Sequence, residues 1–250
     1  MIWYGVKTDT SKDAASVSEE TSTEVSFFNT SSEENFEETT VSVNGESVPK
    51  YSGEPYYVLN NNIPEFSYIT DESFEDYGEL DSLDRCTKAT ACLGTDTAPA
   101  YGEERGDIYF IKPTGWRSER YECVDGESVY NRCHLIAWML GAENANEKNL
   151  VTGTRYMNLE MLEYEIMVDD YIEETENHVM YSVEPYFVGD DAVCRGLIMQ
   201  GFSVEDEGEG ISYNVFFYNV QPGIEIDYST GATEYTGVFL DTDSDAVIID

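Results

Sequence analysis

Basic residues are scarce in this sequence. Its 250 residues hold 13 lysines and arginines against 51 aspartates and glutamates, which gives a formal net charge of −38 at pH 7. Forty-one of the acidic residues lie beyond residue 50, so the main body of the chain is itself acidic. Nucleic-acid binding normally draws on lysine and arginine side chains that neutralise phosphates. The composition therefore argues against a general electrostatic attraction for polyanions.

Long apolar runs are also missing. No segment approaches the roughly 20 apolar residues of a membrane span, and the apolar start of the chain is far shorter than the apolar region of a signal peptide. Residues 1–49 have few large apolar side chains and many Ser, Thr and Glu, which predicts a disordered acidic tail or linker. We expect a folded domain over 50–232 and an acidic C-terminal tail over 233–250.

The five cysteines are an odd number, so at least one is unpaired or bonds to another chain. Cys86 and Cys92 are close enough in sequence to pair. Cys123 and Cys133 lie on opposite sides of a predicted turn but not opposite one another, which places them poorly for a disulfide. No Cys-x-x-Cys or Cys/His spacing suggests a zinc site.

Only two histidines occur, and one of them lies in the most informative stretch of the chain. Residues 128–136 mix β-branched and aromatic side chains and follow the turn dipeptide Asp125-Gly126, so they are expected to form the second arm of a hairpin. A strand over 106–113 is expected to lead into its first arm. His134 then falls near the end of a strand, whereas His178 is expected to be structural.

A loop and a helix are predicted after this strand. Residues 141–149 are rich in Gly, Asn and Glu and have no apolar period. Apolar side chains then recur at helical spacing, and Thr152 or Thr154 can cap the helix; the recurring residues are Met157, Met161, Tyr164, Val168 and Tyr171. Asn158 and Glu165 are seven residues apart, about 10 Å along the axis and nearly on one face.

The rest of the pattern predicts strands. Residues 178–187 and 192–202 read as partners joined by a Gly-Asp-Asp turn, and a long strand follows over 211–220. The expected fold class is α+β, with a mostly antiparallel central sheet on which the helix packs.

An imidazole at a strand end that faces a helical amide and carboxylate suits phosphodiester hydrolysis. A neutral imidazole can take a proton from water, while a hard cation held by few protein oxygens stabilises charge on phosphate. Each residue also has a structural interpretation. A single histidine is more often structural, Asn149 could bond its own loop backbone, and Glu165 could lie on a solvated helix face. The argument depends on their combination.

The string NRCHLIAWMLGAENANEKNLVTGTRYMN resembles the core of the DNA/RNA non-specific endonucleases. This family of ββα-metal (His-Me finger) nucleases includes secreted bacterial and DNA-entry nucleases, and the similarity extends over about residues 48–231. The resemblance implies a ββα-metal motif of hairpin, loop and helix. The family signature is usually Asp-Arg-Gly-His, where this chain has Asn131-Arg132-Cys133-His134.

Position by position, the resemblance implies His134 as general base and Asn158 as the protein ligand of a magnesium ion, with manganese as a substitute. Asn149 matches the asparagine that supports the site, and Glu165 the acidic residue that orients metal-bound water. Arg132 matches a residue that stabilises phosphate, for which its planar fork is well suited.

The resulting hypothesis is a metal-dependent, sequence-non-specific endonuclease acting on DNA and, as a second candidate substrate, RNA. The alternative is a catalytically inactive nuclease-fold binding protein whose acidic surface mimics nucleic acid and engages a basic partner. A protein inhibitor is a further candidate partner. The resemblance implies an extracellular or surface-tethered protein, with the N-terminal tail as spacer.

Three explanations of the acidity stay open: segregated charges, work at high salt where repulsion is screened, or lost activity. Segregation is favoured, because seven of the ten basic residues past residue 50 lie within 105–155. They are expected to gather around one cleft; they are Arg105, Lys112, Arg117, Arg120, Arg132, Lys148 and Arg155.

Overall fold

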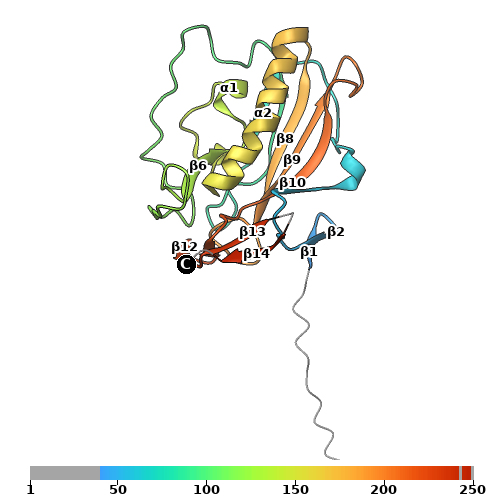
Figure 1. The fold of residues 1–250 in the computed structure, drawn as a ribbon. Helices are drawn as coiled ribbons and strands as arrows, with labels where there is room; N and C mark the ends of the chain where they lie inside the picture. Colours follow the sequence, from blue (N-terminus) through green and yellow to red (C-terminus); the bar gives the residue numbers. More distant parts are fainter. Residues whose placement is uncertain (1–39, 242–243, 249–250) are drawn as a thin grey trace, which may run out of the picture. The chain divides into compact units, whose positions relative to one another are not determined.

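The computed structural model describes residues 40–241 and 244–248, and its largest sheet has six strands (Figure 1). Every neighbouring pair in this sheet is antiparallel. The strands lie in the order β3 (Tyr56–Val58), β10 (Ser212–Tyr218), β9 (Gly196–Ser203), β8 (Val179–Tyr186), β5 (Ala89–Leu93) and β4 (Phe74–Tyr77). The expected pairing of residues 178–187 with 192–202 is thus confirmed, as is the α+β class.

Alternation along each strand divides the sheet's side chains between two cores. On β10, Val215 and Phe217 join the larger core, whereas Phe216 and Tyr218 join the smaller one, because successive side chains of a strand point to opposite faces. The helix α2 (Arg155–Thr175) lies along the face of the sheet that carries the larger core (Figure 1). Its buried residues follow the predicted helical spacing and are Met157, Met161, Val168 and Ile172.

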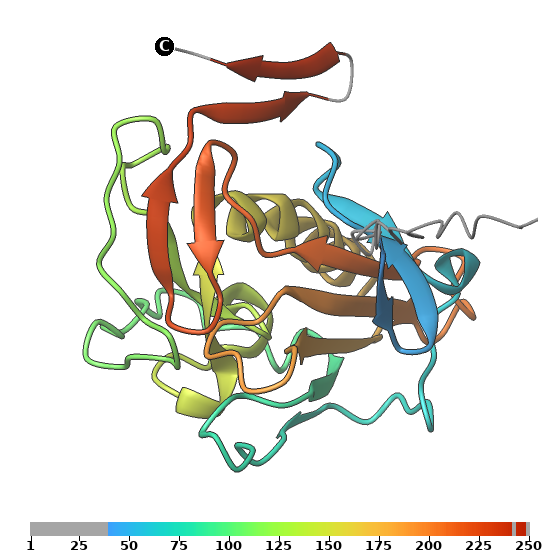
Figure 2. The ribbon, with the colours of Figure 1, turned by 90° about the horizontal axis from the view of Figure 1, so that it is seen from below.

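A short hairpin covers part of the opposite face of the sheet, which carries the smaller core (Figure 2). It consists of β1 (Thr40–Val43) and β2 (Glu46–Pro49), and the side chains of Val43 and Val48 are fully buried. Asn44 and Gly45 form its turn with φ of 48° and 85°, as a two-residue type I′ turn requires. The expectation of a tail up to residue 49 is therefore wrong for residues 40–49. Residues 1–39 lie outside the described part of the chain.

The histidine-containing strand pairs with a different partner from the one expected. β6 (Tyr130–His134) is antiparallel to β7 (Leu150–Thr154), with His134 opposite Leu150. Between them lie α1 (Trp138–Gly141) and the 3-10 turn η2 (Glu147–Asn149). Around the Asp125-Gly126 turn only a single bridge forms, between Arg120 and Ser128. The strand expected over 106–113 is irregular backbone.

The remaining elements are short. They are η1 (Asn60–Asn62), the pair β11 (Ile224–Asp227) and β12 (Ala232–Tyr235), and the pair β13 (Val238–Asp241) and β14 (Ser244–Ile248). The expected C-terminal tail thus contains strands over its described residues, while 242–243 and 249–250 lie outside them. All five cysteines are free, so the Cys86–Cys92 pair does not form. None of the helices in the described ranges has the length and apolar character needed to span a membrane.

The cap of α2 gives a test of how the motif is held. Thr154 Oγ1 accepts a hydrogen bond from Met157 N at 3.1 Å and donates one to the Val220 carbonyl at 2.6 Å. Thr154→Ala should lower the free energy of unfolding by about 1–2 kcal/mol, because both bonds are lost at a buried cap. Urea denaturation measures the change. Thr154→Ser keeps the hydroxyl and should retain most of the stability; an equal loss in both variants would contradict the cap's contribution.

Candidate active site

The environment of His134 fixes its tautomer. The imidazole is 5% exposed at the end of β6. Its Nε2 lies 3.1 Å from the Asn144 carbonyl oxygen, and its Nδ1 lies 3.0 Å from Nη2 of Arg105. A carbonyl can only accept a hydrogen bond and a guanidinium can only donate one. Nε2 therefore carries the proton, and the lone pair of Nδ1 points toward Arg105.

The imidazole is also neutral at ordinary pH. The pKa of His134 is lowered to about 4: burial is the main cause, the hydrogen bond to the Asn144 carbonyl acts in the opposite direction, and the positive charge of Arg105 adds to the lowering. A neutral imidazole with a free lone pair is able to accept a proton from water. The geometry thus gives His134 the protonation state that a general base needs.

Arg105 links His134 to the helix. Besides its contact with Nδ1, its charge lowers the pKa of Glu165, although burial dominates and raises that pKa to about 7. Arg105 also lines a cavity of about 510 Å³ together with Arg132 and Asn158, the site cavity. The sequence singled out Arg105 only as a member of the basic group. No local motif marks it, since it lies in irregular backbone 29 residues before the histidine.

Of the residues implied by the resemblance, Arg132 and Asn158 line the site cavity, and Arg105 connects them to His134. Asn158 is half-buried on the first turn of α2. Glu165 lies two turns further along the same helix and is close enough to Arg105 for its pKa to respond. The predicted common face of Asn158 and Glu165 is compatible with this arrangement.

Arg132 is held by contacts with other protein groups. Its Nε donates to the Ile111 carbonyl at 2.5 Å, and its Nη2 donates to the Tyr109 carbonyl. The guanidinium also lies over the Trp116 ring, 4.0 Å from the centroid. These contacts explain why 106–113 is not a strand, because two carbonyls that would pair with a neighbouring strand bond to Arg132. Three of the five N–H groups of Arg132 are not used in these contacts.

Asn149 lies behind the site, where both ends of its amide bind backbone. Oδ1 accepts from Ile136 N at 2.8 Å, and Nδ2 donates to the Ile136 carbonyl at 3.0 Å. The residue is fully buried and does not line the site cavity. It therefore fixes the chain two residues after His134, which makes it a positioning residue.

The seven basic residues are less clustered than expected, since only Arg105, Arg132 and Arg155 line the site cavity. Arg155 bonds to Asp125 through Nη2, at 2.8 Å, and through Nε. Three of the other four bond to groups elsewhere in the protein: Lys148 to Glu79, Arg120 to Glu127, and Arg117 to the Thr230 carbonyl.

The donors at the site cavity fit a hard divalent cation. The described residues contain no group of three or more His, Cys, Asp or Glu side chains arranged to hold a metal ion, so a closed zinc site of the usual ligand set is not formed there. Asn158 offers one carboxamide oxygen beside an open cavity, and magnesium typically takes one or two protein oxygens and several waters. Arg105 already places a positive charge between His134 and Glu165.

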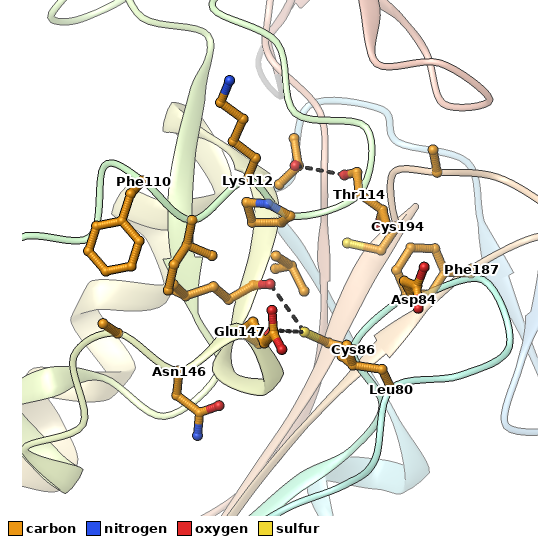
Figure 3. Close-up of a pocket in the computed structure, with 17 residues that line it drawn as sticks. Leu80, Asp84, Cys86, Phe110, Lys112, Thr114, Asn146, Glu147, Phe187 and Cys194 are labelled. Carbon is orange, nitrogen blue, oxygen red and sulfur yellow. Dashed lines mark hydrogen bonds between the residues drawn. The ribbon is translucent and has the colours of Figure 1, made fainter.

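A larger cavity of about 850 Å³ lies beside residues 110–114, which contribute to its wall (Figure 3). Cys86 lines it and donates from Sγ to the carbonyls of Glu147 and Leu150, both at 3.1 Å. Burial raises the pKa of the Cys86 thiol to about 11 and that of the neighbouring Cys194 to about 12. Neither thiol is therefore a nucleophile at neutral pH. No sequence motif predicts this cavity.

Comparison with known proteins agrees with this geometry. A family model described as DNA/RNA non-specific endonuclease matches residues 64–204. The structure of NucA from Streptococcus agalactiae with a magnesium ion bound is similar over 74% of this chain and 89% of NucA, with a TM-score of 0.63 and 23% identity. The Sda1 nuclease with a bound zinc ion is similar over 71% of this chain and 95% of its own, with a TM-score of 0.57 and 23% identity.

A structure described as an extracellular endonuclease is similar over 72% of this chain and 96% of its own, with a TM-score of 0.51 and 21% identity. At these identities the likeness to solved structures establishes a common fold. No curated protein sequence matches the chain.

The depressed pKa of His134 predicts a pH dependence of stability. In the unfolded chain the imidazole binds a proton below about pH 6.5, but in the folded protein only below about pH 4. Protons therefore favour the unfolded state between these values, and the stabilisation present above pH 6.5 is lost as pH falls toward 4, by about 3 kcal/mol. The difference in unfolding free energy between wild type and His134→Gln, measured from pH 7.5 to 4.5, should shrink accordingly. A constant difference would show that His134 titrates normally.

Proposed function

The chain belongs to the DNA/RNA non-specific endonuclease family, and from this premise we propose that it is a metal-dependent endonuclease that hydrolyses phosphodiester bonds of DNA and RNA without sequence preference. The observation that carries the proposal is the neutral, singly oriented imidazole of His134, whose unprotonated Nδ1 is bonded to an arginine that shares a cavity with Asn158.

The residues divide the chemistry between them. His134 Nδ1 takes a proton from the attacking water, and the Asn144 carbonyl stabilises the imidazolium through Nε2. Before Nδ1 can take this proton, Arg105 has to give up its contact with Nδ1 and bind the phosphate instead. Arg105 and the unused N–H groups of Arg132 then stabilise the negative charge of the phosphate. Asn149 holds the backbone that carries the base.

Asn158 would hold the magnesium ion, for which manganese is the expected substitute, and Glu165 would orient water at the site. The ion, when bound, supplies positive charge that stabilises the phosphate in the transition state. Burial raises the pKa of Glu165 to about 7. A cation bound beside the carboxyl group would lower this pKa and favour the carboxylate form.

Sequence independence follows from which groups face the site cavity. Its arginines are suited to phosphate oxygens, and contacts to phosphate and sugar carry no sequence information directly. An extracellular location is supported by the similar structure described as an extracellular endonuclease. Arg105, Arg132 and Arg155 give the cavity local positive charge in a chain of net charge −38, so activity is expected to depend on salt.

The overall charge favours a second candidate, an inactive nuclease-fold protein whose acidic surface binds a basic partner. Its support is that four of the seven basic residues within 105–155 do not line the site cavity, and that two of the three that do, Arg132 and Arg155, bond to protein groups. The arrangement of His134 favours the enzyme, because a buried imidazole with one nitrogen fixed by a carbonyl is unnecessary for binding through acidic groups.

The first test is nicking of supercoiled plasmid by the full chain with magnesium or chelator across a salt series. We expect magnesium-dependent nicking that falls by at least about 10²-fold in His134→Ala, since a general base contributes roughly 10²–10⁴ in rate. His178→Ala is the matched control, because His178 is partly exposed and pairs with Glu205 at 2.6 Å. Full turnover in His134→Ala would remove the general base. No nicking under any condition, manganese included, would favour the acidic binding protein.

The role of Asn158 is tested by metal titration of the same reaction. Asn158→Ala removes the only protein oxygen assigned to the ion and should raise the magnesium concentration for half-maximal rate by roughly 10-fold or more. Asn158→Asp keeps an oxygen at the same position and should need far less additional magnesium than the alanine variant. An unchanged titration curve in Asn158→Ala would assign the ion to other residues.

A further inference from the structure

Two adjacent aromatic side chains project from the irregular segment beside the site cavity. Tyr109 is 68% exposed and Phe110 is 62% exposed. Their rings lie edge to face with centroids 6.2 Å apart. Burial of aromatic rings stabilises a fold, so two neighbouring rings that stay exposed are available to contact a ligand.

The backbone beneath these rings is held by several contacts. Arg132 donates to the carbonyls of Tyr109 and Ile111, and its guanidinium lies on the Trp116 ring. The Asp107 carboxylate accepts from Tyr109 N at 2.9 Å, and a turn closes between Ile111 N and the Ile108 carbonyl at 3.1 Å. The exposed rings therefore stand on a fixed support, so little ordering entropy is lost when a ligand contacts them.

The two rings border different cavities. Tyr109 lines the site cavity together with Asn158 and Arg105. Phe110 lines the larger cavity, where Figure 3 shows its ring at the edge of the group of lining side chains. The pair thus borders both cavities, and a phosphate held in the site cavity would lie in a space that Tyr109 lines.

We propose that Tyr109 and Phe110 form a stacking platform for unstacked bases next to the scissile phosphate, which directs the enzyme toward single-stranded or locally unpaired nucleic acid. The proposal rests on the proposed function and adds its substrate class. Aromatic side chains bind every base through its face, so such a platform requires no sequence preference. In a duplex the base faces are already covered by neighbouring base pairs, and only the edges are accessible in the grooves.

The charges at the site cavity support the same substrate. Arg132 and Arg155 already bond to protein groups, and Asp107 adds a negative charge at the rim. With few free cations the protein gains little from the release of counterions that drives binding to duplex DNA. Stacking of bases on Tyr109 and Phe110 supplies an attraction that depends less on charge than phosphate binding does. The net charge of −38 and added salt therefore weaken it less.

The test measures binding and cleavage with three labelled probes of equal length: a thymidine single strand, an abasic strand with the same phosphates, and a duplex. Binding is read by fluorescence anisotropy in the His134→Ala background with magnesium, and cleavage in the otherwise wild-type chain. The variants are Tyr109→Ala, Phe110→Ala, their double, and Tyr109→Phe, which keeps the ring. Tyr101→Ala is the matched control, because Tyr101 is fully exposed in the same irregular segment and lines neither cavity.

We expect each alanine variant to weaken binding of the thymidine strand roughly 5- to 100-fold, the range that loss of one stacked base gives. Tyr109→Phe and Tyr101→Ala should bind as the parent does. The abasic strand should bind the parent weakly and respond little to any variant, and cleavage of the single strand should fall in parallel with its binding.

Unchanged binding of the thymidine strand by the double variant would overturn the platform, even if the wild type is an active nuclease. Equal losses with the thymidine and abasic strands would also overturn it, since the rings would then support the loop without contacting bases. If the wild type cleaves nothing, the proposed function fails, but the anisotropy series still decides whether the rings bind bases. The two failures are therefore distinguishable.

Discussion

One hydrogen bond, from Nε2 of His134 to the Asn144 carbonyl, decides what the imidazole can do. Without it either ring nitrogen could hold the proton, and the lone pair would have no fixed direction. The bond requires the loop after β6 to return to the end of that strand. Asn149 meets this requirement by bonding both backbone groups of Ile136, while Leu135 N bonds to the Asn149 carbonyl. The orientation of the imidazole thus depends on an asparagine that does not line the site cavity.

The acidity of the chain constrains how the rest of the site is built. Of the arginines at the site cavity, Arg132 is largely committed to the segment 109–111 and Arg155 to Asp125, which leaves Arg105 as the cation nearest the base. A site with few free cations cannot hold a polyanion by charge alone. Binding must then come from an added metal ion, from contacts that do not depend on charge, or from both. The exposed rings of Tyr109 and Phe110 are available for the second kind of contact.

The sequence predicted the elements whose signals are local. The helix after Thr154 has a cap and a regular apolar period, and the strands joined by the Gly-Asp-Asp turn are neighbours in the chain. Prediction from the sequence failed where a strand pairs with a segment distant in the chain, and where a pattern typical of a strand also occurs in irregular backbone. The Asp125-Gly126 turn looked like the centre of a hairpin, but β6 pairs with β7, beyond a loop of 15 residues. Residues 106–113 alternate like a strand, but Arg132 binds two of their carbonyls. The dipeptide Asn44-Gly45 is typical of the type I′ turn that it forms, but the composition of the surrounding residues predicts a disordered tail.

The cysteine of the Asn-Arg-Cys-His string shows why a departure from the family signature need not affect the site. Along β6, Arg132 lines the site cavity and His134 contacts Arg105, whereas Cys133 between them points into the core. There the Cys133 Sγ lies 3.8 Å from the Met161 sulfur. Gly153 on the neighbouring strand has no side chain, and a Cβ at that position would lie only 2.7 Å from the Cys133 Cβ. The neighbouring strand thus provides the space that the extra side chain needs. Burial raises the pKa of the Cys133 thiol well above its usual range, so it stays uncharged and unreactive. The cysteine therefore affects the packing behind His134 and not the side of β6 that carries Arg132 and His134.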